Sequence, residues 1–261
     1  MAAMHTYRLP YVLLLSSAIF VVPTLSLAAP NRDATPPTSS ESAYCVAAAN
    51  RIQTLEGHFT ADSTARQGVE SKENVHLRDY RSSVDTKLTD ERAKKDASRA
   101  QWYAKLEGAA VTAQAKGSEM AFESSVNAAV AVKRASNDSA TASFRAKQDV
   151  AIATRRGSVD QGIATRNQAI LTAAQTAASQ CASGTASATV RSTFKSSVTA
   201  AQAAFKATDS AAWSASASAQ KGREADRKAA EAANYATFKS SVATALATLK
   251  ASRASSVPSP K

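Results

Sequence analysis

The sequence predicts an all-α protein, an elongated antiparallel three-helix coiled-coil-like bundle with degenerate 11-residue periodicity. The chain has no proline between Pro37 and Pro258, and proline costs about 3 kcal/mol inside a helix. Alanine dominates the composition while large apolar side chains are sparse, so long helices with narrow contacts are favoured over a globular core. Apolar residues recur at multiples of eleven, a period typical of nearly straight or slightly right-handed helix winding.

The two ends of the chain are predicted to lie outside the bundle. Residues 1–28 have the plan of a secretory signal peptide: His5 and Arg8 are basic, "YVLLLSSAIFVV" is apolar, and "LSLAAP" offers a cleavage site. The apolar run is too short for a comfortable membrane span, although an uncleaved anchor is the alternative. Residues 29–42 are predicted to be a flexible leader and 253–261 a disordered tail. We therefore expect an exported protein that is periplasmic, cell-surface or extracellular.

Residues 43–252 are predicted to form a helical rod with two turns. Gly117 and Ser118 give a C-cap glycine followed by an N-cap candidate, and "CASGTASAT" around Gly184 repeats this arrangement. The resulting helices span about 43–115, 119–181 and 187–252, and their similar lengths and short connections favour antiparallel neighbours. Weaker interruptions occur at Gly68, Arg155–Gly162 and Gln220–Gly222. The polar region around 60–76 is the weakest helical signal.

The two cysteines give an independent check on this arrangement. Cys45 opens the first predicted helix and Cys181 closes the second, so a turn near Gly117 brings both sulfurs to one end of the rod. An even cysteine count in an exported protein favours a disulfide. Closing so long a loop would stabilise the fold by about 4–5 kcal/mol through loop-closure entropy. Two free thiols, or a bridge between two chains, are the alternatives.

A recurring phrase marks the predicted packing face. "TFKSSV" occurs at Thr193–Val198 and at Thr237–Val242, so its phenylalanines are four eleven-residue periods apart and lie on one helix face. We interpret it as an aromatic-plus-valine packing unit and assign no chemistry to its serines. The predicted packing stripe consists of Tyr80, Val84, Trp102, Phe122, Val126, Phe144, Ile163, Phe194, Val198, Phe205, Phe238, Val242 and Leu249.

No catalytic, cofactor-binding or metal site is predicted. His58 and His76 have no partner at metal-ligand spacing, and the chain has no glycine-rich phosphate loop or nucleophile elbow. The sequence thus favours a non-enzymatic protein without cofactors. Trp102 and Tyr103 are the strongest candidate for a binding pair, but the predicted hairpin places Trp102 against Phe122, which favours core packing.

The net charge of +11 favours an anionic partner. Envelope polymers or another protein fit this requirement. Nucleic acid is disfavoured because the basic residues are dispersed among acids and the aromatic residues lie on the packing stripe. We expect no membrane span after signal removal, and self-association remains open.

Three stretches carry a family resemblance: "ANRIQTLEGHF", "RAQWYAKLEG" and "CASGTASATVRSTF". They resemble an uncharacterised family of exported, alanine-rich helical proteins of candidate phyla radiation bacteria, and both cysteines match that pattern. The resemblance implies compartment and fold and supplies no activity. We expect a structural or adhesive role at the cell envelope or surface. The alternatives are a periplasmic-type holdase chaperone, or a binder of anionic polymers or nucleic acid.

Overall fold

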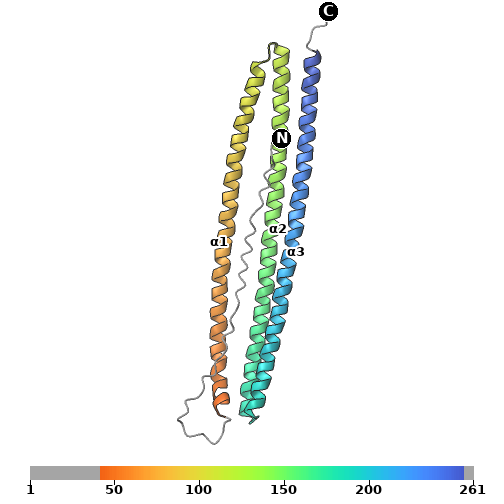
Figure 1. Cartoon of the computed structure of the whole chain (residues 1–261). Coiled ribbons are helices and arrows are strands. Elements are labelled where there is room, and N and C mark those ends of the chain that lie inside the picture. The colour runs from red at the N-terminus through yellow and green to blue at the C-terminus, as the bar shows by residue number, and fades with distance from the viewer. Residues whose placement is uncertain (1–41, 256–261) are drawn as a thin grey trace, which may run out of the picture. The chain divides into compact units, whose positions relative to one another are not determined.

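The structure, a computed structural model, describes residues 42–255, which form three long helices. Helix α1 spans Ser42–Gly108, α2 spans Ala113–Ala182 and α3 spans Ser187–Ser255. Each has between 67 and 70 residues, so each is about 100 Å long at the usual rise of an α-helix. The helices lie alongside one another (Figure 1). The predicted all-helical class with three helices is confirmed for this part of the chain. The predicted signal peptide, residues 29–41 of the predicted leader and residues 256–261 of the predicted tail lie outside the described residues. Residues 253–255, predicted as part of the disordered tail, are instead the last residues of α3.

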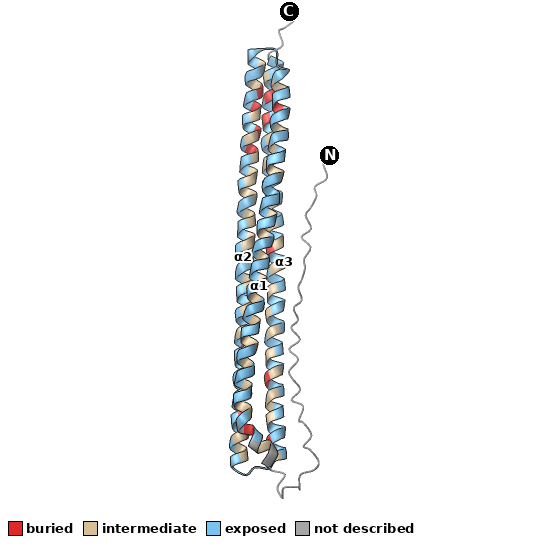
Figure 2. Cartoon of the chain, turned by 90° about the vertical axis from the view of Figure 1, so that its left-hand side faces the viewer, coloured by how far each residue is buried: buried red, intermediate tan, exposed pale blue. Residues whose placement is uncertain are grey.

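The three helices do not share contacts equally. Helix α2 packs most extensively against α3 and makes fewer contacts with α1. Helices α1 and α3 contact each other very little. Most side chains are therefore exposed or half-buried, and few are buried (Figure 2). Contacts between α1 and α2 run in opposite order along the two helices: Arg81 pairs with Asp149, and Arg92 pairs with Asp138.

The first turn lies earlier than the sequence predicts. Helix α1 ends at Gly108 and α2 begins at Ala113, so Gly117 lies inside α2. Thr112 is the N-cap: its backbone is extended and its hydroxyl accepts a hydrogen bond from the Ala115 N–H at 3.1 Å. Ser118, the predicted cap, instead donates to the Gln114 carbonyl at 3.0 Å, one helical turn back. A threonine cap thus starts this helix, and Gly117 is tolerated within it.

The second turn is built around Gly184, inside the predicted break. Gly184 has a φ of +77°, which favours glycine because other residues would be strained there. Its N–H donates to the Cys181 carbonyl at 3.1 Å, and the Thr185 N–H donates to the Gln180 carbonyl at 3.0 Å. These two bonds form a Schellman motif, which satisfies the last carbonyls of α2.

The weaker predicted interruptions all lie within helices. The region 60–76 is helical, and its Thr60 and Thr64 hydroxyls donate to carbonyls four residues earlier. Gly162 has a packing role: a Cβ added there would lie 3.1 Å from the Thr208 Cγ2 atom and 3.2 Å from the Phe205 Cδ2 atom. This glycine therefore allows α2 and α3 to approach closely.

A disulfide joins one end of α1 to the end of α2. Cys45 and Cys181 are bonded; their Cα atoms are 5.4 Å apart, and their sequence separation is 136. Ala48 and Ala177, one helical turn away from these cysteines, are buried, and Val190 at the start of α3 is completely buried. Small side chains allow close approach of helices at this end, and the bond fixes α1 beside α2.

The opposite end contains the main apolar cluster, to which all three helices contribute. Its buried members are Tyr103, Phe122, Val126, Ala245 and Leu249. Leu106, Val130 and Val242 pack around them. Burial of such side chains is worth about 1.5–3 kcal/mol each, so this cluster is the principal hydrophobic anchor of the described residues.

Candidate functional site

The structure places most of the predicted packing stripe in the helix contacts, with two exceptions. Phe122, Val126 and Leu249 are buried. The half-buried members are Val84, Phe144, Ile163, Phe194, Val198, Phe205, Phe238 and Val242. Tyr80 and Trp102 are 45% and 50% exposed, so neither is buried in the helix contacts, although the Trp102 ring lies against Phe122 as predicted.

The reason for these two exceptions lies in the contacts of α1. Because α1 packs mainly on α2, residues on its other faces remain in solvent. Tyr103, next to Trp102, takes the buried position and is 3% exposed. The Trp102 ring still lies edge-on to the rings of Tyr103 and Phe122, with centroid distances of 5.1 and 6.1 Å. Trp102 therefore borders the apolar cluster without entering it.

The half-buried aromatic rings lie beneath basic side chains of a neighbouring helix. Arg166 of α2 lies 5.0 Å from the Phe205 ring centroid of α3, and Arg155 lies 4.0 Å from that of Trp213. Other such pairs join Arg51 to Phe194, Lys133 to Phe238 and Arg227 to Phe144. Burial lowers the pKa of Arg166. Cation–π contacts thus supplement the sparse apolar packing.

The contact between α1 and α2 is largely ionic. An arginine on one helix faces a carboxylate on the other at regular intervals along the contact; we call this set the ionic ladder. Its pairs are Arg66–Asp160, Glu73–Arg156, Arg81–Asp149, Asp85–Arg145, Arg92–Asp138 and Asp96–Arg134. Except for Arg66–Asp160, the shortest N–O distances lie between 2.5 and 2.8 Å. The arginine side chains are 17–28% exposed and the carboxylates 35–55% exposed, so the arginine stems also cover apolar surface.

The ionic ladder repeats every eleven residues. On α2, its arginines are residues 134, 145 and 156, and its aspartates are residues 138, 149 and 160. On α1, Arg81 and Arg92 are separated by the same interval, as are Asp85 and Asp96. From Arg81 to Asp96 the intervals are equal on both helices, which keeps these pairs in register, whereas Arg66 and Glu73 depart from the eleven-residue interval on α1. Several pairs are bidentate: Arg145 donates to both Asp85 oxygens at 2.7 and 2.8 Å.

Two carboxyl groups of the ionic ladder, Asp85 and Asp96, have a lowered pKa. Asp96 receives hydrogen bonds from Arg134 and Arg99, and these lower its pKa to about 2. The hydrogen bond from Arg145 lowers the pKa of Asp85. Both carboxylates therefore favour the charged form in the folded state, so both pairs are ionised at neutral pH.

Near the first turn, the eleven-residue repeat no longer places an arginine opposite a carboxylate. One period beyond Asp96 and Arg134, it brings two glutamates together, Glu107 of α1 and Glu123 of α2. Burial and a hydrogen bond with Glu123 raise the pKa of Glu107. Glu119, 2% exposed, forms an ion pair with Arg253 of α3. Beside the apolar cluster, a pair of carboxyl groups thus stands between α1 and α2 where the ladder has a salt bridge, and the salt bridge there joins α2 to α3.

Sequence analysis missed the ionic ladder, although its signal was present. The interval between Arg134 and Asp138 recurs at Arg145 and Asp149 and again at Arg156 and Asp160. The eleven-residue interval of arginine and aspartate therefore marks, in the sequence itself, the face of α2 that contacts α1.

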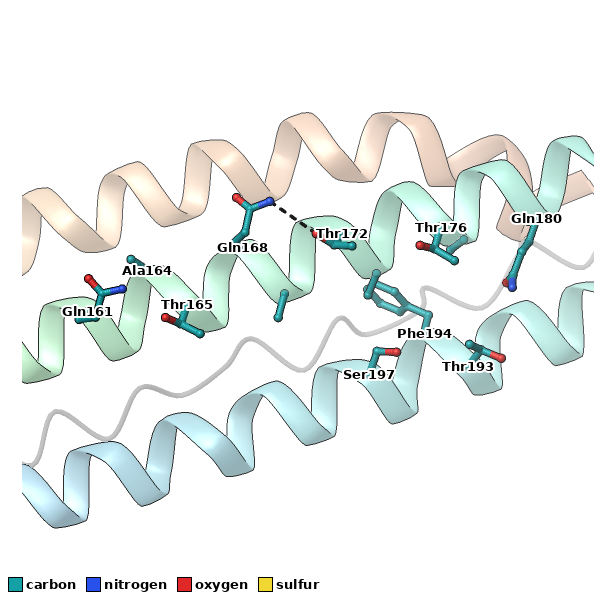
Figure 3. Close-up of a pocket in the computed structure, with 13 residues that line it drawn as sticks. Gln161, Ala164, Thr165, Gln168, Thr172, Thr176, Gln180, Thr193, Phe194 and Ser197 are labelled. Atoms are coloured by element: carbon teal, nitrogen blue, oxygen red, sulfur yellow. Dashed lines mark hydrogen bonds between the residues drawn. The ribbon is translucent and has the colours of Figure 1, made fainter.

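Grooves follow the contact between α2 and α3. The groove in Figure 3 has a volume of about 730 Å³, and its α2 wall includes Gln161, Gln168 and Thr172. Gln168 donates to the Thr172 hydroxyl at 3.5 Å, and Phe194 of α3 lies between the two helices. Among the described residues, no charged side chain lines this groove. It can therefore accept polar, uncharged or apolar groups, and it provides no acid–base pair.

No metal site is found in residues 42–255: His, Cys, Asp and Glu side chains nowhere group in threes that could hold an ion. His58 and His76 are both exposed on α1. The described helices also contain no stretch with the length and hydropathy that a bilayer crossing needs. No known protein family, curated protein or solved structure matches the chain.

Proposed function

We propose that this protein is an exported, non-enzymatic helical rod with a structural or adhesive role at the cell envelope or surface. In this proposal the signal sequence directs export and the disulfide forms in an oxidising compartment. The three helices act as an antiparallel coiled-coil-like bundle with a degenerate eleven-residue repeat. The resemblance to exported, alanine-rich helical proteins of candidate phyla radiation bacteria agrees with this compartment.

The ionic ladder is the observation that carries the proposal. Its repeat holds α1 against α2 from Arg66 to Arg99, where the helices share little apolar surface. Ion pairs with bidentate geometry fix the relative position of two helices more strictly than apolar contacts do. A set of such pairs along about 40–45 Å of each helix therefore suits a rigid strut.

Most arginines of the helix contacts have protein partners, whereas many lysines are exposed. The exposed lysines support an anionic partner. Arginines form the ionic ladder and cover the aromatic rings, as described above. Exposed lysines lie along all three helices: Lys72, Lys87, Lys94, Lys105, Lys116, Lys195, Lys206, Lys221, Lys228, Lys239 and Lys250. A lysine ammonium is a flexible, strongly hydrated point charge. These residues can contact anionic envelope polymers without disturbing the helix contacts.

The test is binding to washed cell envelopes. We expect the full chain to sediment with envelopes and to be released by salt, because screening weakens contacts between exposed charges. Replacing Lys195, Lys206, Lys239 and Lys250 together by glutamine should reduce the bound fraction severalfold, whereas the matched lysine-to-arginine variant should bind as before. A chain that stays in the supernatant at low salt would contradict the proposed role.

A holdase chaperone is the second candidate, and exposed apolar side chains near the first turn favour it. Val111 is 95% exposed, Met120 is 60% exposed and Trp102 is 50% exposed. Each lies within about ten residues of the turn, which concentrates apolar surface at one end. Such surface is typical of sites that contact other proteins.

The holdase role is separable from the structural role. A holdase should suppress aggregation of several unfolded clients at near-stoichiometric ratio. Changing Val111 and Met120 to serine should abolish the suppression, while changing the exposed Val69 of α1 to serine should not. If no client is protected, the structural role alone remains.

A further inference from the structure

Arg223 stands apart from the other basic residues in the contact between α2 and α3. It is 8% exposed, and its Nε atom is buried without a hydrogen-bond partner. Within residues 42–255, no carboxylate lies within ion-pair distance of its guanidinium and no aromatic ring lies beneath it. The neighbouring Arg227, by contrast, bonds Glu231 at 2.9 Å and covers the Phe144 ring. The Nε atom of Arg227 is also buried without a hydrogen-bond partner, but the rest of that guanidinium has protein partners, whereas Arg223 has neither a carboxylate nor a ring. A largely buried arginine in this situation is energetically costly, so it favours a compensating group from outside the chain.

Arg223 lines a groove that is otherwise mainly apolar. The groove runs between Ala146–Ser158 of α2 and Ala212–Asp226 of α3 and has a volume of about 660 Å³. Alanines of both helices contribute to its walls, and Val150 is 66% exposed within it. An exposed valine among alanines offers apolar surface that a ligand would remove from water.

The charges of this groove favour an anion. Arg155 also lines it, and its guanidinium lies over the Trp213 ring, not beside an acid. The acid that lines the groove, Asp226, is paired with Lys147 at 2.7 Å. The groove therefore has an excess of positive charge, and Arg223 is the member with no protein partner.

We propose that this groove binds a single-chain anionic amphiphile, a fatty acid carboxylate, with its headgroup on Arg223 and its alkyl chain along the α2–α3 groove. The α2 wall extends for about 18 Å at the rise of an α-helix, which accommodates an extended acyl chain. The carboxylate accepts hydrogen bonds from the guanidinium in the planar geometry that arginine provides. A free phosphate would leave the apolar walls unused, and a fatty alcohol would leave Arg223 unpaired.

The test is calorimetric titration of the full, disulfide-bonded chain with dodecanoate below its micelle concentration. We expect saturable binding at one site per chain. Arg223→Gln should weaken it at least tenfold, whereas Lys221→Gln, which removes the same charge from an exposed position on α3, should leave it unchanged. Dodecanol, acetate and dodecyltrimethylammonium should bind at least tenfold more weakly than dodecanoate.

A second pair of variants keeps the test independent of any effect of Arg223→Gln on folding. Val150→Glu places a negative charge in the groove at an exposed position and should abolish binding, whereas Val69→Glu on α1 should have no effect. Circular dichroism checks that all variants stay helical. Absence of dodecanoate binding, equal binding of dodecanol or acetate, or binding insensitive to both Arg223→Gln and Val150→Glu would overturn the proposal. Binding seen only with anionic phospholipid vesicles would also overturn it, because it would identify a membrane surface as the partner.

Discussion

The apolar cluster near the first turn and the ionic ladder hold the same helices by different means. In the cluster, Tyr103 of α1, Phe122 of α2 and Leu249 of α3 are each less than 10% exposed. In the ladder, α1 and α2 are joined by pairs such as Asp85–Arg145, whose carboxylate is 51% exposed. The cluster joins three helices over a short distance, whereas the ladder joins two along residues 66–96 of α1 and 134–160 of α2.

The two kinds of contact contribute differently: one mainly to the free energy of unfolding, and the other mainly to the register of α1 against α2. Buried apolar side chains contribute kilocalories each, while half-exposed ion pairs contribute about 0.2–1 kcal/mol each. An apolar contact is, however, non-directional, and a bidentate arginine–carboxylate pair accepts few arrangements. We infer that the cluster and the disulfide supply most of the stability, and that the ladder determines which residues of α1 and α2 face each other.

The largest expected effect is loss of the disulfide. Replacing Cys45 and Cys181 together by serine should lower the free energy of unfolding by about 4–5 kcal/mol, because the bond closes a long loop. Urea unfolding followed by circular dichroism measures the change. The unreduced and dithiothreitol-treated wild-type chain provide the control, and the reduced chain should match the double variant. Equal stability of oxidised and reduced protein would show that the cluster alone holds α1.

Truncation of the apolar cluster should rank second. Leu249→Ala removes a side chain that is 6% exposed and should cost about 3 kcal/mol. Leu246→Ala, one turn earlier on α3 and 41% exposed, is the matched control and should cost less than about 1 kcal/mol. Similar costs for the two leucines would contradict the assignment of this cluster as the hydrophobic anchor.

Charge reversal in the ionic ladder should have a smaller effect, and a reversible one. Asp85→Arg places two guanidinium groups opposite each other and should lower stability by about 1 kcal/mol. Adding Arg145→Asp restores opposite charges and should recover most of the loss. Unfolding at low and high salt gives a further check, since the coupling between the two changes should shrink as salt screens it. Strictly additive effects would indicate that the pair contributes no coupling.

Replacement by alanine should change the free energy of unfolding differently at two glycines of α2. No atom lies within 4 Å of a Cβ added at Gly157, so Gly157→Ala should raise the free energy of unfolding by about 0.5–1 kcal/mol through helix propensity. At Gly162 the added methyl group meets Thr208 and Phe205 at 3.1–3.2 Å. Gly162→Ala should therefore be about 1 kcal/mol less stable than Gly157→Ala. Thermal melts of the two variants measure this difference. An equal rise in melting temperature for both would mean that α2 and α3 are farther apart at Gly162 than the structure shows.

The pH dependence should distinguish Asp96 from Glu107. The folded-state pKa of Asp96 is lowered to about 2, so its stabilisation is present above the unfolded pKa of about 4 and is lost as pH falls through about 2. Asp96→Asn should flatten the acid-unfolding curve in that window. Glu107 has a raised pKa, so its contribution is lost as pH rises through that pKa, and Glu107→Gln should raise the melting temperature at pH 7. A melting temperature unchanged at pH 7 would contradict the proximity of Glu123.

Several features of the fold were predictable from local sequence. Absence of proline, abundance of alanine and the glycine at residue 184 indicate long helices and one turn, because helix propensity and left-handed φ are properties of single residues. The first turn was misplaced because Thr112 and Ser118 are both acceptable caps, and the choice between them depends on packing at the apolar cluster. The exposure of Tyr80 and Trp102 was likewise unpredictable without knowing that α1 contacts mainly α2.

Sequence alone predicts that residues 42–255 are helical. It also shows where cysteines are available for bonding and which residues recur every eleven positions. Tertiary structure decided what each recurrence does: phenylalanines of "TFKSSV" lie beneath Arg51 and Lys133, and the arginines of α2 pair with α1. It also decided that Arg223 is buried without a partner while Lys221 is exposed. A periodicity specifies a face of a helix, and only the neighbouring helices specify whether that face meets a ring, a carboxylate or a groove.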